Sequence, residues 1–285
     1  MASAKEIRGQ IKAIQSTAKI TKAMEMVAAS KMRKAQERVT AGRAYAEGIK
    51  RVVANLMQAH PEYKHPFVVK REQVKRVGLI LVNTDKGLCG GLNTNAQRMA
   101  LNLVKDSAVE VEAYTLGRRA GQFMRKIVDD LRASEENIPD AAELKDVLGV
   151  ITVAMDRYVK GEVDEVSLVF TEYVNTMTQT PVKIQLLPCA DDIEPSHPGY
   201  WDYIYEPDSK EVLDGLLRRY VESLVYHAVL ENKACEHSAR MVAMKSATDN
   251  AKDIAQNLKI TYNKARQAGI TQEIAEICSG AAAAA

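Results

Sequence analysis

Apolar and small residues recur along the first 60 residues at alternating steps of four and three. Only Thr21, Glu25 and Gly42 interrupt this series, and no proline occurs before Pro61. A 3.5-residue period kept over about seven heptads is typical of a coiled-coil helix, which at 1.5 Å per residue would be roughly 80 Å long. The positions are Ile7, Ile11, Ile14, Ala18, Thr21, Glu25, Ala28, Met32, Ala35, Val39, Gly42, Ala46, Ile49, Val53 and Leu56.

The last part of the chain predicts a second long helix. No proline follows Pro207, and residues 209–278 are mostly good helix formers. Small side chains in its predicted seam let two helices approach closely, so we expect an antiparallel coiled coil formed by the N- and C-terminal helices, with a globular head at one end. The seam residues are Cys235, Ala239, Val242, Ser246, Ile254, Leu258, Ala265, Ala268 and Ala275.

The middle of the chain has a different pattern, in which short runs of branched or aromatic residues alternate with helical periods. This alternation predicts an α/β head with an at least partly parallel sheet, and "NTMTQT" predicts a hairpin before Pro181. The expected strands are 77–84, 109–117, 163–175 and 181–188, and the expected helices are 95–106, 118–128 and 141–160.

These patterns divide the chain into five segments. We expect an N-terminal coiled-coil helix in residues 1–60, a connection in 61–76, the α/β head in 77–188, a connecting loop in 189–208 and a C-terminal coiled-coil helix in 209–285. The loop is acidic, rich in proline and aromatic, which favours a surface position.

Charge is distributed unevenly. Residues 1–60 hold 12 Lys and Arg against 4 Asp and Glu, so this segment carries +8 in a chain of net charge +2. Such a segment suits a nucleic acid, an anionic lipid surface or an acidic protein, or is simply a solvated helix face. Proteins that bind single-stranded nucleic acid interleave aromatic and basic residues. Here Tyr45 is the only aromatic residue before Tyr63, so the segment lacks that pattern.

The four cysteines lie far apart with no C-x-x-C pair, which indicates neither a zinc site nor a disulfide framework and favours a reducing compartment. No apolar run approaches the roughly 20 residues of a membrane span, and the first residues lack a signal-peptide core. We expect a soluble chain without a direct membrane span that can attach to a membrane assembly.

The stretch "LVNTDKGLCGGLNTN", Leu81 to Asn95, predicts a strand, a glycine-rich turn and a helix. This setting can bind phosphate, but Gly87, Gly90 and Gly91 fit neither the P-loop nor the dinucleotide spacing. The alternative is a tight turn in which glycine permits unusual backbone angles or close approach. The sequence also lacks an H-E-x-x-H or G-x-S-x-G motif, so we predict no catalytic residue, metal site or cofactor.

Two segments carry more apolar surface than one coiled-coil partner needs. In "ITKAMEMVAASKMRKA", Ile20 to Ala35, apolar residues spread widely around the helix, and "KARQAGITQEIAEICSGAAAAA" loses its basic residues after Arg266. A helix that is apolar on several faces is enclosed by other protein. In an antiparallel pair both segments lie towards the same end.

Several stretches together resemble one family. They are "KITKAMEMVAASKMRKAQ", "TDKGLCGGLN", "RRYVES", "ARMVAMKSATDNA" and "YNKARQAGITQEIAEICSGA", and they resemble the gamma subunits of F-type ATP synthases over essentially the whole chain. The resemblance implies a non-catalytic rotor whose paired end helices enter a ring of alpha and beta subunits, while the head meets the epsilon subunit and the membrane c-ring. It implies no nucleic-acid partner.

The resemblance also implies contact residues. Met24 and Arg240 are expected to meet the lever segment of a beta subunit, and Tyr205 is expected near the epsilon and c-ring end. Arg266, Gln267 and Thr271, with Glu276 nearby, are expected to contact the beta loops that hold the axle.

We further expect the glycine turn to be a contact surface of the head, with Leu88, Cys89 and Leu92 giving it an apolar face and Cys89 within reach of the beta subunit. The chain has no inserted cysteine pair of the chloroplast type, so we expect no redox gating. We expect a peripheral position on the cytoplasmic face of a bacterial inner membrane.

Overall fold

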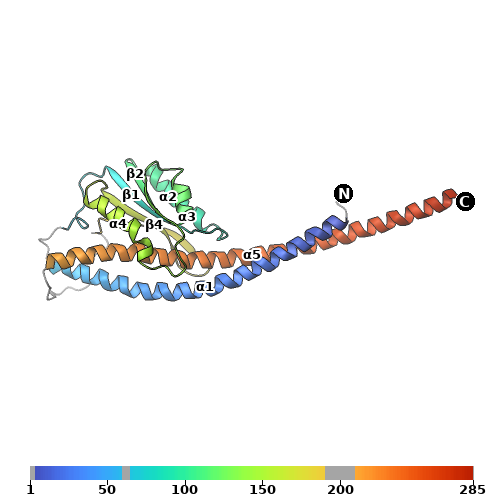
Figure 1. Cartoon of the computed structure of the whole chain (residues 1–285), viewed down its shortest axis with the longest axis horizontal. Coiled ribbons are helices and arrows are strands. Elements are labelled where there is room, and N and C mark those ends of the chain that lie inside the picture. Colours follow the sequence, from blue (N-terminus) through green and yellow to red (C-terminus); the bar gives the residue numbers. More distant parts are fainter. Residues whose placement is uncertain (1–3, 60–64, 190–208, 285) are drawn as a thin grey trace. The chain divides into compact units, whose positions relative to one another are not determined.

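The computed structural model describes residues 4–59, 65–189 and 209–284. The described part of the chain begins with a long helix, α1 (Ala4–Ala59), and ends with another, α5 (Ser209–Ala284). The sequence between them forms a sheet and three shorter helices (Figure 1). The chain divides into a terminal unit, Met1–Ala28 with Met241–Ala285, and a central unit, Ala29–Arg240. Each long helix contributes residues to both units.

The central unit contains a five-stranded sheet in the order β3-β2-β1-β4-β5. The first four strands in this order are parallel, and β5 pairs antiparallel with β4. The strands are β1 (Arg76–Val82), β2 (Glu110–Leu116), β3 (Leu131–Glu135), β4 (Glu165–Tyr173) and β5 (Gln179–Leu187).

Helices cover both faces of the sheet, and the alternation of side chains along β1 shows why. Leu79 and Leu81 pack with α2 (Leu92–Asp106) and α3 (Arg118–Met124), whereas Ile80 and Val82 pack in a second core with α4 (Lys145–Val159). This second core also receives the central-unit parts of α1 and α5. The chain therefore steps outward along the sheet over one face and returns from β3 to β4 over the other, as right-handed crossovers require.

The predicted parallel sheet and hairpin are confirmed by the β1–β4 and β4–β5 pairs. Strand β3 was not predicted, since "LRASE" is short, polar and only half-buried at the sheet edge. A run of five residues with so little apolar alternation cannot be distinguished from a loop by its pattern. The hairpin closes between Asn175 and Thr178, whose backbone groups hydrogen-bond to each other.

The predicted seam of α1 is confirmed. Every seam residue whose side chain is described is buried or half-buried, including the three that interrupt the apolar series. In the terminal unit Thr21 lies against Thr248 of α5, with 2.7 Å between their hydroxyl oxygens. In the central unit a Cβ at Gly42 would lie 3.4 Å from Leu230, so glycine permits the close approach of α1 and α5 there.

The predicted seam of α5 is partly wrong. Ser246, Ile254, Ala268 and Ala275 are exposed, while Met244, Thr248, Ala251 and Ala255 are buried. The buried positions follow the same four-three spacing in another register. Small residues occur on several faces of this helix, so composition did not distinguish the two registers.

The antiparallel register leaves the end of α5 unaccompanied by the described part of α1. Counting from Thr21 back to Ala4, and the same distance forward from Thr248, reaches Ala265. From Arg266 to Ala281 every described side chain except Gly269 is exposed.

Candidate functional site

Apolar side chains stand exposed on the α1 part of the terminal unit. Ile20, Met26 and Val27 are 59%, 59% and 56% exposed, and Met24 is half-buried beside the seam. The seam to α5 uses Thr21 and Ala28, which are buried, so the exposed side chains of Ile20, Met26 and Val27 are not needed for the helix pair. They form a surface suited to another protein.

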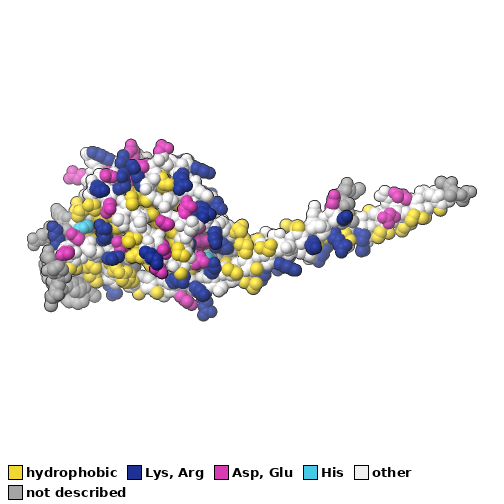
Figure 2. Space-filling view, viewed as in Figure 1, with side chains coloured by type: hydrophobic (Ala, Val, Ile, Leu, Met, Phe, Trp, Pro, Cys, Tyr) yellow, Lys and Arg dark blue, Asp and Glu magenta, His cyan; other side chains and the backbone are white. Residues whose placement is uncertain are grey.

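A second apolar surface lies on the end of α5. Ile270, Ile274 and Ile277 share one helix face at spacings of four and three and are 48%, 56% and 72% exposed. Figure 2 shows hydrophobic side chains along one side of this end of the chain. Folding of this unit does not bury them.

The sequence-predicted contact residues of α5 lie on the same exposed segment. Arg266, Gln267, Thr271 and Glu276 are all exposed. The Thr271 hydroxyl donates to the carbonyl of Gln267 at 2.9 Å, and Gln272 donates to the Glu276 carboxylate at 2.9 Å. The structure thus places these four residues together on one helix end, with Ile270 and Ile274 among them.

The glycine turn after β1 is closed by its own side chains. The carboxamide oxygen of Asn93 accepts the backbone N–H of Thr84 at 3.1 Å, and its nitrogen donates to the Thr84 hydroxyl at 2.8 Å. In a phosphate-binding turn such an N–H would face the anion. Gly90 is required for another reason, because its φ of 58° lies in the left-handed region that glycine adopts without steric cost.

A cavity of about 1070 Å³ lies at a different edge of the sheet. Its walls include Lys75, Arg76 and Glu110, at the amino ends of β1 and β2, and Arg157 of α4. In open α/β sheets nucleotides bind outside the carboxyl ends. Neither the turn nor this cavity has the arrangement of a nucleotide site.

The expected apolar face of the turn is wrong for two of its three residues. Cys89 is 2% exposed and Leu92 is 5% exposed, and both pack against Cys235 of α5. Burial also raises the pKa of the Cys89 thiol. Only Leu88, which is 62% exposed, faces outward. A direct partner contact of Cys89 stays a prediction.

Arg240 ties the turn to α5. Its guanidinium donates to the backbone carbonyl of Gly87 at 3.2 Å and to the Glu236 carboxylate at 2.7 Å, and its side chain is only 12% exposed. Within the chain Arg240 therefore positions the turn. A direct partner contact of Arg240 stays a prediction.

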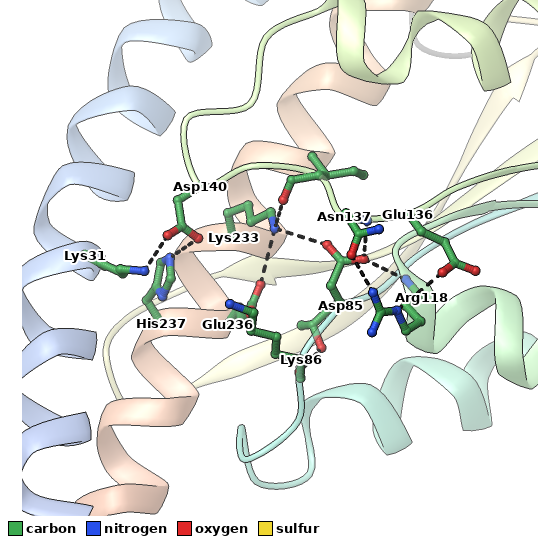
Figure 3. A network of polar contacts seen from close by, with 12 residues as sticks. Lys31, Asp85, Lys86, Arg118, Glu136, Asn137, Asp140, Lys233, Glu236 and His237 are labelled. Atoms are coloured by element: carbon green, nitrogen blue, oxygen red, sulfur yellow. Dashed lines mark hydrogen bonds and ion pairs between the residues drawn. The ribbon is translucent and has the colours of Figure 1, made fainter. Parts of the chain in front are cut away.

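A buried polar network extends from this point between α5, the turn and the loop that follows β3 (Figure 3). Lys233 donates to the carbonyl of Ile138 at 2.8 Å and lies 3.8 Å from Asp85 and 3.6 Å from Glu236. Asp85 also accepts the backbone N–H groups of Arg118 and Asn137. One buried cation thus joins three segments that are distant in sequence.

Asp140 joins the same loop to both long helices. It accepts from Lys31 of α1 at 2.7 Å and lies 3.2 Å from Nε2 of His237 on α5. Its partial burial opposes ionisation, but the hydrogen bond from Lys31 and the nearby His237 and Lys233 lower the pKa of Asp140. Burial lowers the pKa of His237, which keeps this imidazole neutral near pH 7.

Sequence reasoning missed this network because its members lie on five separate segments, namely α1, the turn, α3, the loop after β3 and α5. The sequence feature that could have indicated it is "ENKACEHS", Glu231 to Ser238. This stretch is rich in charged residues, and every one of its side chains is buried. Tyr205, with Tyr203 and Glu206, lies outside the described residues. Within the described ranges no helix is both long and apolar enough to cross a membrane, and no cluster of potential ligands could hold a metal ion.

The family model described as ATP synthase matches residues 3–284 of this chain. The relatives include the ATP synthase gamma chain of Methylobacillus flagellatus, which is 52% identical over 290 residues and matches 99% of this chain and 100% of its own length. The gamma chain of Azoarcus sp. is 53% identical over 288 residues, with the same coverage.

Solved structures of ATP synthase chains resemble this chain in fold. A chain from the central stalk and c-ring of the Tetrahymena thermophila mitochondrial ATP synthase is 25% identical, with a TM-score of 0.63 over 80% of this chain and 99% of that one. A rotor chain of the Euglena gracilis mitochondrial ATP synthase resembles this chain in fold, with a TM-score of 0.67, 20% identity and coverage of 94% and 98%.

Proposed function

The chain belongs to the family of ATP synthase gamma chains, and we propose that it is the non-catalytic rotor of the central stalk, which couples proton flow through the membrane ring to ATP synthesis or hydrolysis in the catalytic ring. The enzyme activity belongs to the whole complex. This chain supplies the moving contact between its two parts.

The exposed isoleucine stripe at the end of α5 is the observation that carries the proposal. Ile270, Ile274 and Ile277 follow one helix face where the described part of α1 no longer accompanies α5. Water contact at three large apolar side chains is unfavourable, at about 25 cal/mol per Å² of apolar surface. Enclosure of this helix end by a ring of partner subunits removes that cost.

A rotor acts by contacting equivalent subunits unequally. The terminal unit is asymmetric, since the exposed apolar surface of α1 at Ile20, Met26 and Val27 differs from the isoleucine face of α5. Each catalytic subunit around such an axle meets different contacts, and differential contacts shift each subunit towards a different conformation. Rotation then exchanges these conformations among the subunits.

The proposed partners are the alpha and beta subunits around the long helices, and the epsilon subunit and membrane c-ring at the head. Met24 is assigned to a beta lever segment, and the exposed group at the end of α5 is assigned to the beta loops that hold the axle. At the glycine turn, Cys89 keeps its proposed contact with the beta subunit, and the neighbouring Leu88 is the residue of this turn whose side chain faces outward. Tyr205 keeps its proposed role near epsilon and the c-ring.

We place the chain on the cytoplasmic face of a bacterial inner membrane as a peripheral subunit, without a span of its own. The similar gamma chains of Methylobacillus flagellatus and Azoarcus sp. are bacterial, which supports this placement. The proposal is tested by purifying the chain from its native host in mild detergent and identifying the proteins that accompany it. Recovery of alpha, beta, epsilon and c subunits is expected, and recovery without any of them would refute the rotor function.

The α5 contacts are tested by a double substitution of Gln267 and Thr271 by alanine. We expect slower steady-state ATP turnover at equal assembly, because polar contacts to the beta loops are lost. Thr261→Ala is the matched control, since the Thr261 hydroxyl is exposed and donates to the carbonyl of Asn257 just as that of Thr271 donates to Gln267. Equal turnover in the two variants and the wild type would remove these residues from the contact.

A further inference from the structure

Two histidines lie in the seam between α1 and α5 of the central unit. From His227, alternating steps of three and four residues lead to Leu230, Ala234 and His237. The last three are buried, and His227 is half-buried. This spacing is that of one coiled-coil face, so both imidazoles occupy positions at which paired helices ordinarily carry apolar side chains.

His227 packs against Gly42 of α1. A Cβ at this glycine would lie 3.6 Å from Cδ2 of the imidazole. The charged groups that face the ring are Arg43 and Glu47 on α1 and Glu231 on α5, whose carboxylate lies 3.4 Å from Nδ1. Burial and Arg43 lower the pKa of His227, although Glu47 and a backbone carbonyl of α1 act to raise it.

His237 is enclosed more completely (Figure 3). Its Nε2 lies 3.2 Å from Asp140, which already accepts a hydrogen bond from Lys31 of α1. Its Nδ1 is buried and has no hydrogen-bond partner within the described residues. Glu236 and Arg240, both on α5, are the other charged groups that face the ring.

A proton on His237 would place an uncompensated cation in the seam. The imidazolium donates from both nitrogens, and Nδ1 has no acceptor in the part of the chain that the structure describes. Burial, Arg240 and Lys31 oppose the charge more than Glu236 and Asp140 favour it, so the pKa of His237 is lowered. Opening of the seam would let water solvate the imidazolium and remove this cost.

The seam of the terminal unit is of a different kind. It pairs Thr21 with Thr248 and buries Met244, Ala251 and Ala255, and none of these side chains titrates. Acidification therefore acts on the central-unit part of the seam alone. The terminal unit provides an internal control for any experiment on this chain.

We propose that the seam around His227 and His237 is a pH-sensitive joint, which is closed near neutral pH and opens as the two imidazoles take up protons. The same stretch of α5 holds the loops of the head, through Lys233 and Arg240. Opening of the joint separates α1 from the helix that carries the head, so torque passes less well through the pair. The joint itself is independent of the proposed function, whereas its effect on torque rests on that function.

Hydrogen exchange of the full chain, measured by mass spectrometry and corrected for the intrinsic effect of pH, tests the joint. Between pH 7.5 and pH 5.5, exchange in residues 31–45 should accelerate about tenfold for each histidine that the closed seam keeps neutral, because the open form binds that proton with the ordinary pKa. Exchange in residues 11–21 should stay constant. Constant exchange in residues 31–45, or equal acceleration in both segments, overturns the proposal.

The double variant His227→Gln with His237→Gln removes both titrating groups and keeps side chains that can donate hydrogen bonds. Its corrected exchange should be the same at the two pH values, and each single variant should lose part of the acceleration, which keeps the test decisive if the double variant is unstable. His65→Gln is the matched control, since His65 is also buried but lies beside Asp214 outside the seam, and it should open as the wild type does. Acceleration of wild-type size in the variants of the seam would refute the joint.

Reconstituted membranes test the effect on torque. The ratio of protons pumped to ATP hydrolysed should fall between pH 7.5 and pH 5.5 in complexes that contain the wild-type chain, and it should stay constant with the double variant. An equal ratio in both complexes at pH 5.5 would refute this effect. Absence of ATP synthase subunits from the purified chain would instead refute the proposed function, and the exchange experiment would still decide the joint.

Discussion

Lys233 shows at the scale of one residue how the head is joined to the long helix. Its side chain is 8% exposed, and its ammonium group faces Asp85, Glu236 and a backbone carbonyl. Removing one member of a buried charged group leaves the others uncompensated, which typically costs about 3–5 kcal/mol. We therefore expect Lys233→Met to lower the free energy of unfolding by about that amount, measured by urea denaturation.

Lys145→Met is the matched control for this substitution. Lys145 is 73% exposed and pairs with Glu143 at 2.8 Å, so both partners remain in water when the pair is broken. Its stability should equal that of the wild type. A similar loss in both variants would show that the Lys233 network is no stronger than a surface ion pair.

His237 predicts a dependence of stability on pH. Burial lowers its pKa below the ordinary value of 6.5, so between that value and the folded pKa the unfolded chain binds the proton more readily. Stability is therefore complete above pH 6.5 and falls as the pH drops towards the folded pKa. The pKa of Asp140 is lowered below 3.8, so the stability that its ionised carboxylate contributes is lost only at more acidic pH.

The measurement is the urea midpoint between pH 8 and pH 5 for the wild type and His237→Gln. The variant should lose less stability over this range than the wild type. A residual slope is expected in the variant, because burial also lowers the pKa of His227 and His65. Identical slopes would mean that His237 titrates normally in the folded chain.

At the scale of elements, the paired threonines test the register of the two helices in the terminal unit. The Thr21 and Thr248 hydroxyls are 2.7 Å apart and buried. Thr21→Val or Thr248→Val alone removes the bond between the helices and leaves the other hydroxyl with the backbone carbonyl of Ala18 or Met244 in its own helix. The cost of each single variant should therefore be that of one hydrogen bond, about 0.5–1.5 kcal/mol, and the double variant should lie closer to the wild type than the sum of the two.

A double-mutant cycle by thermal unfolding gives this coupling. Thr17→Val is the control, since the Thr17 hydroxyl is exposed and donates only to the carbonyl of Ala13 in its own helix. Additive effects of Thr21→Val and Thr248→Val would show that the two residues do not face each other.

The same elements show how far the sequence alone predicts this fold. The seam of α1 was predictable because large apolar residues such as Ile7, Ile49 and Val53 mark one face. Part of the seam of α5, including Ser246 and Ile254, was placed in the wrong register. Alanine, serine and threonine occur all round that helix, and burial of an alanine differs little from its exposure in free energy.

The candidate site was predictable only where its signal is local. The excess apolar surface at Met26 and Val27 could be seen in one short segment, and both residues are exposed. The orientation of Cys89 and Leu88 depends on the positive φ of Leu88 and on packing against Cys235, which is far away in the sequence. The sequence of the turn predicts neither of these. Asp85, Asp140 and Lys233 likewise meet only after the sheet and helices have packed.

At the scale of the whole molecule, the isoleucine stripe of α5 separates folding from assembly. Replacement of Ile270, Ile274 and Ile277 by glutamine preserves helix propensity and removes apolar surface that the chain itself leaves exposed. The isolated variant should therefore keep its helicity and its unfolding temperature. Its affinity for the alpha and beta assembly should fall at least about tenfold, since only about 1.4 kcal/mol of the lost apolar burial is needed for that change.

The comparison with Val159→Gln makes this prediction specific. Val159 is 53% exposed on α4 of the central unit, so its substitution removes a similar side chain from a surface outside the axle. If the stripe is enclosed by the ring, only the triple variant loses affinity, and proton pumping driven by ATP hydrolysis weakens with it in reconstituted membranes. If both variants bind as the wild type does, the end of α5 is not enclosed by the ring, and the contact must be made through the exposed apolar surface of α1 instead.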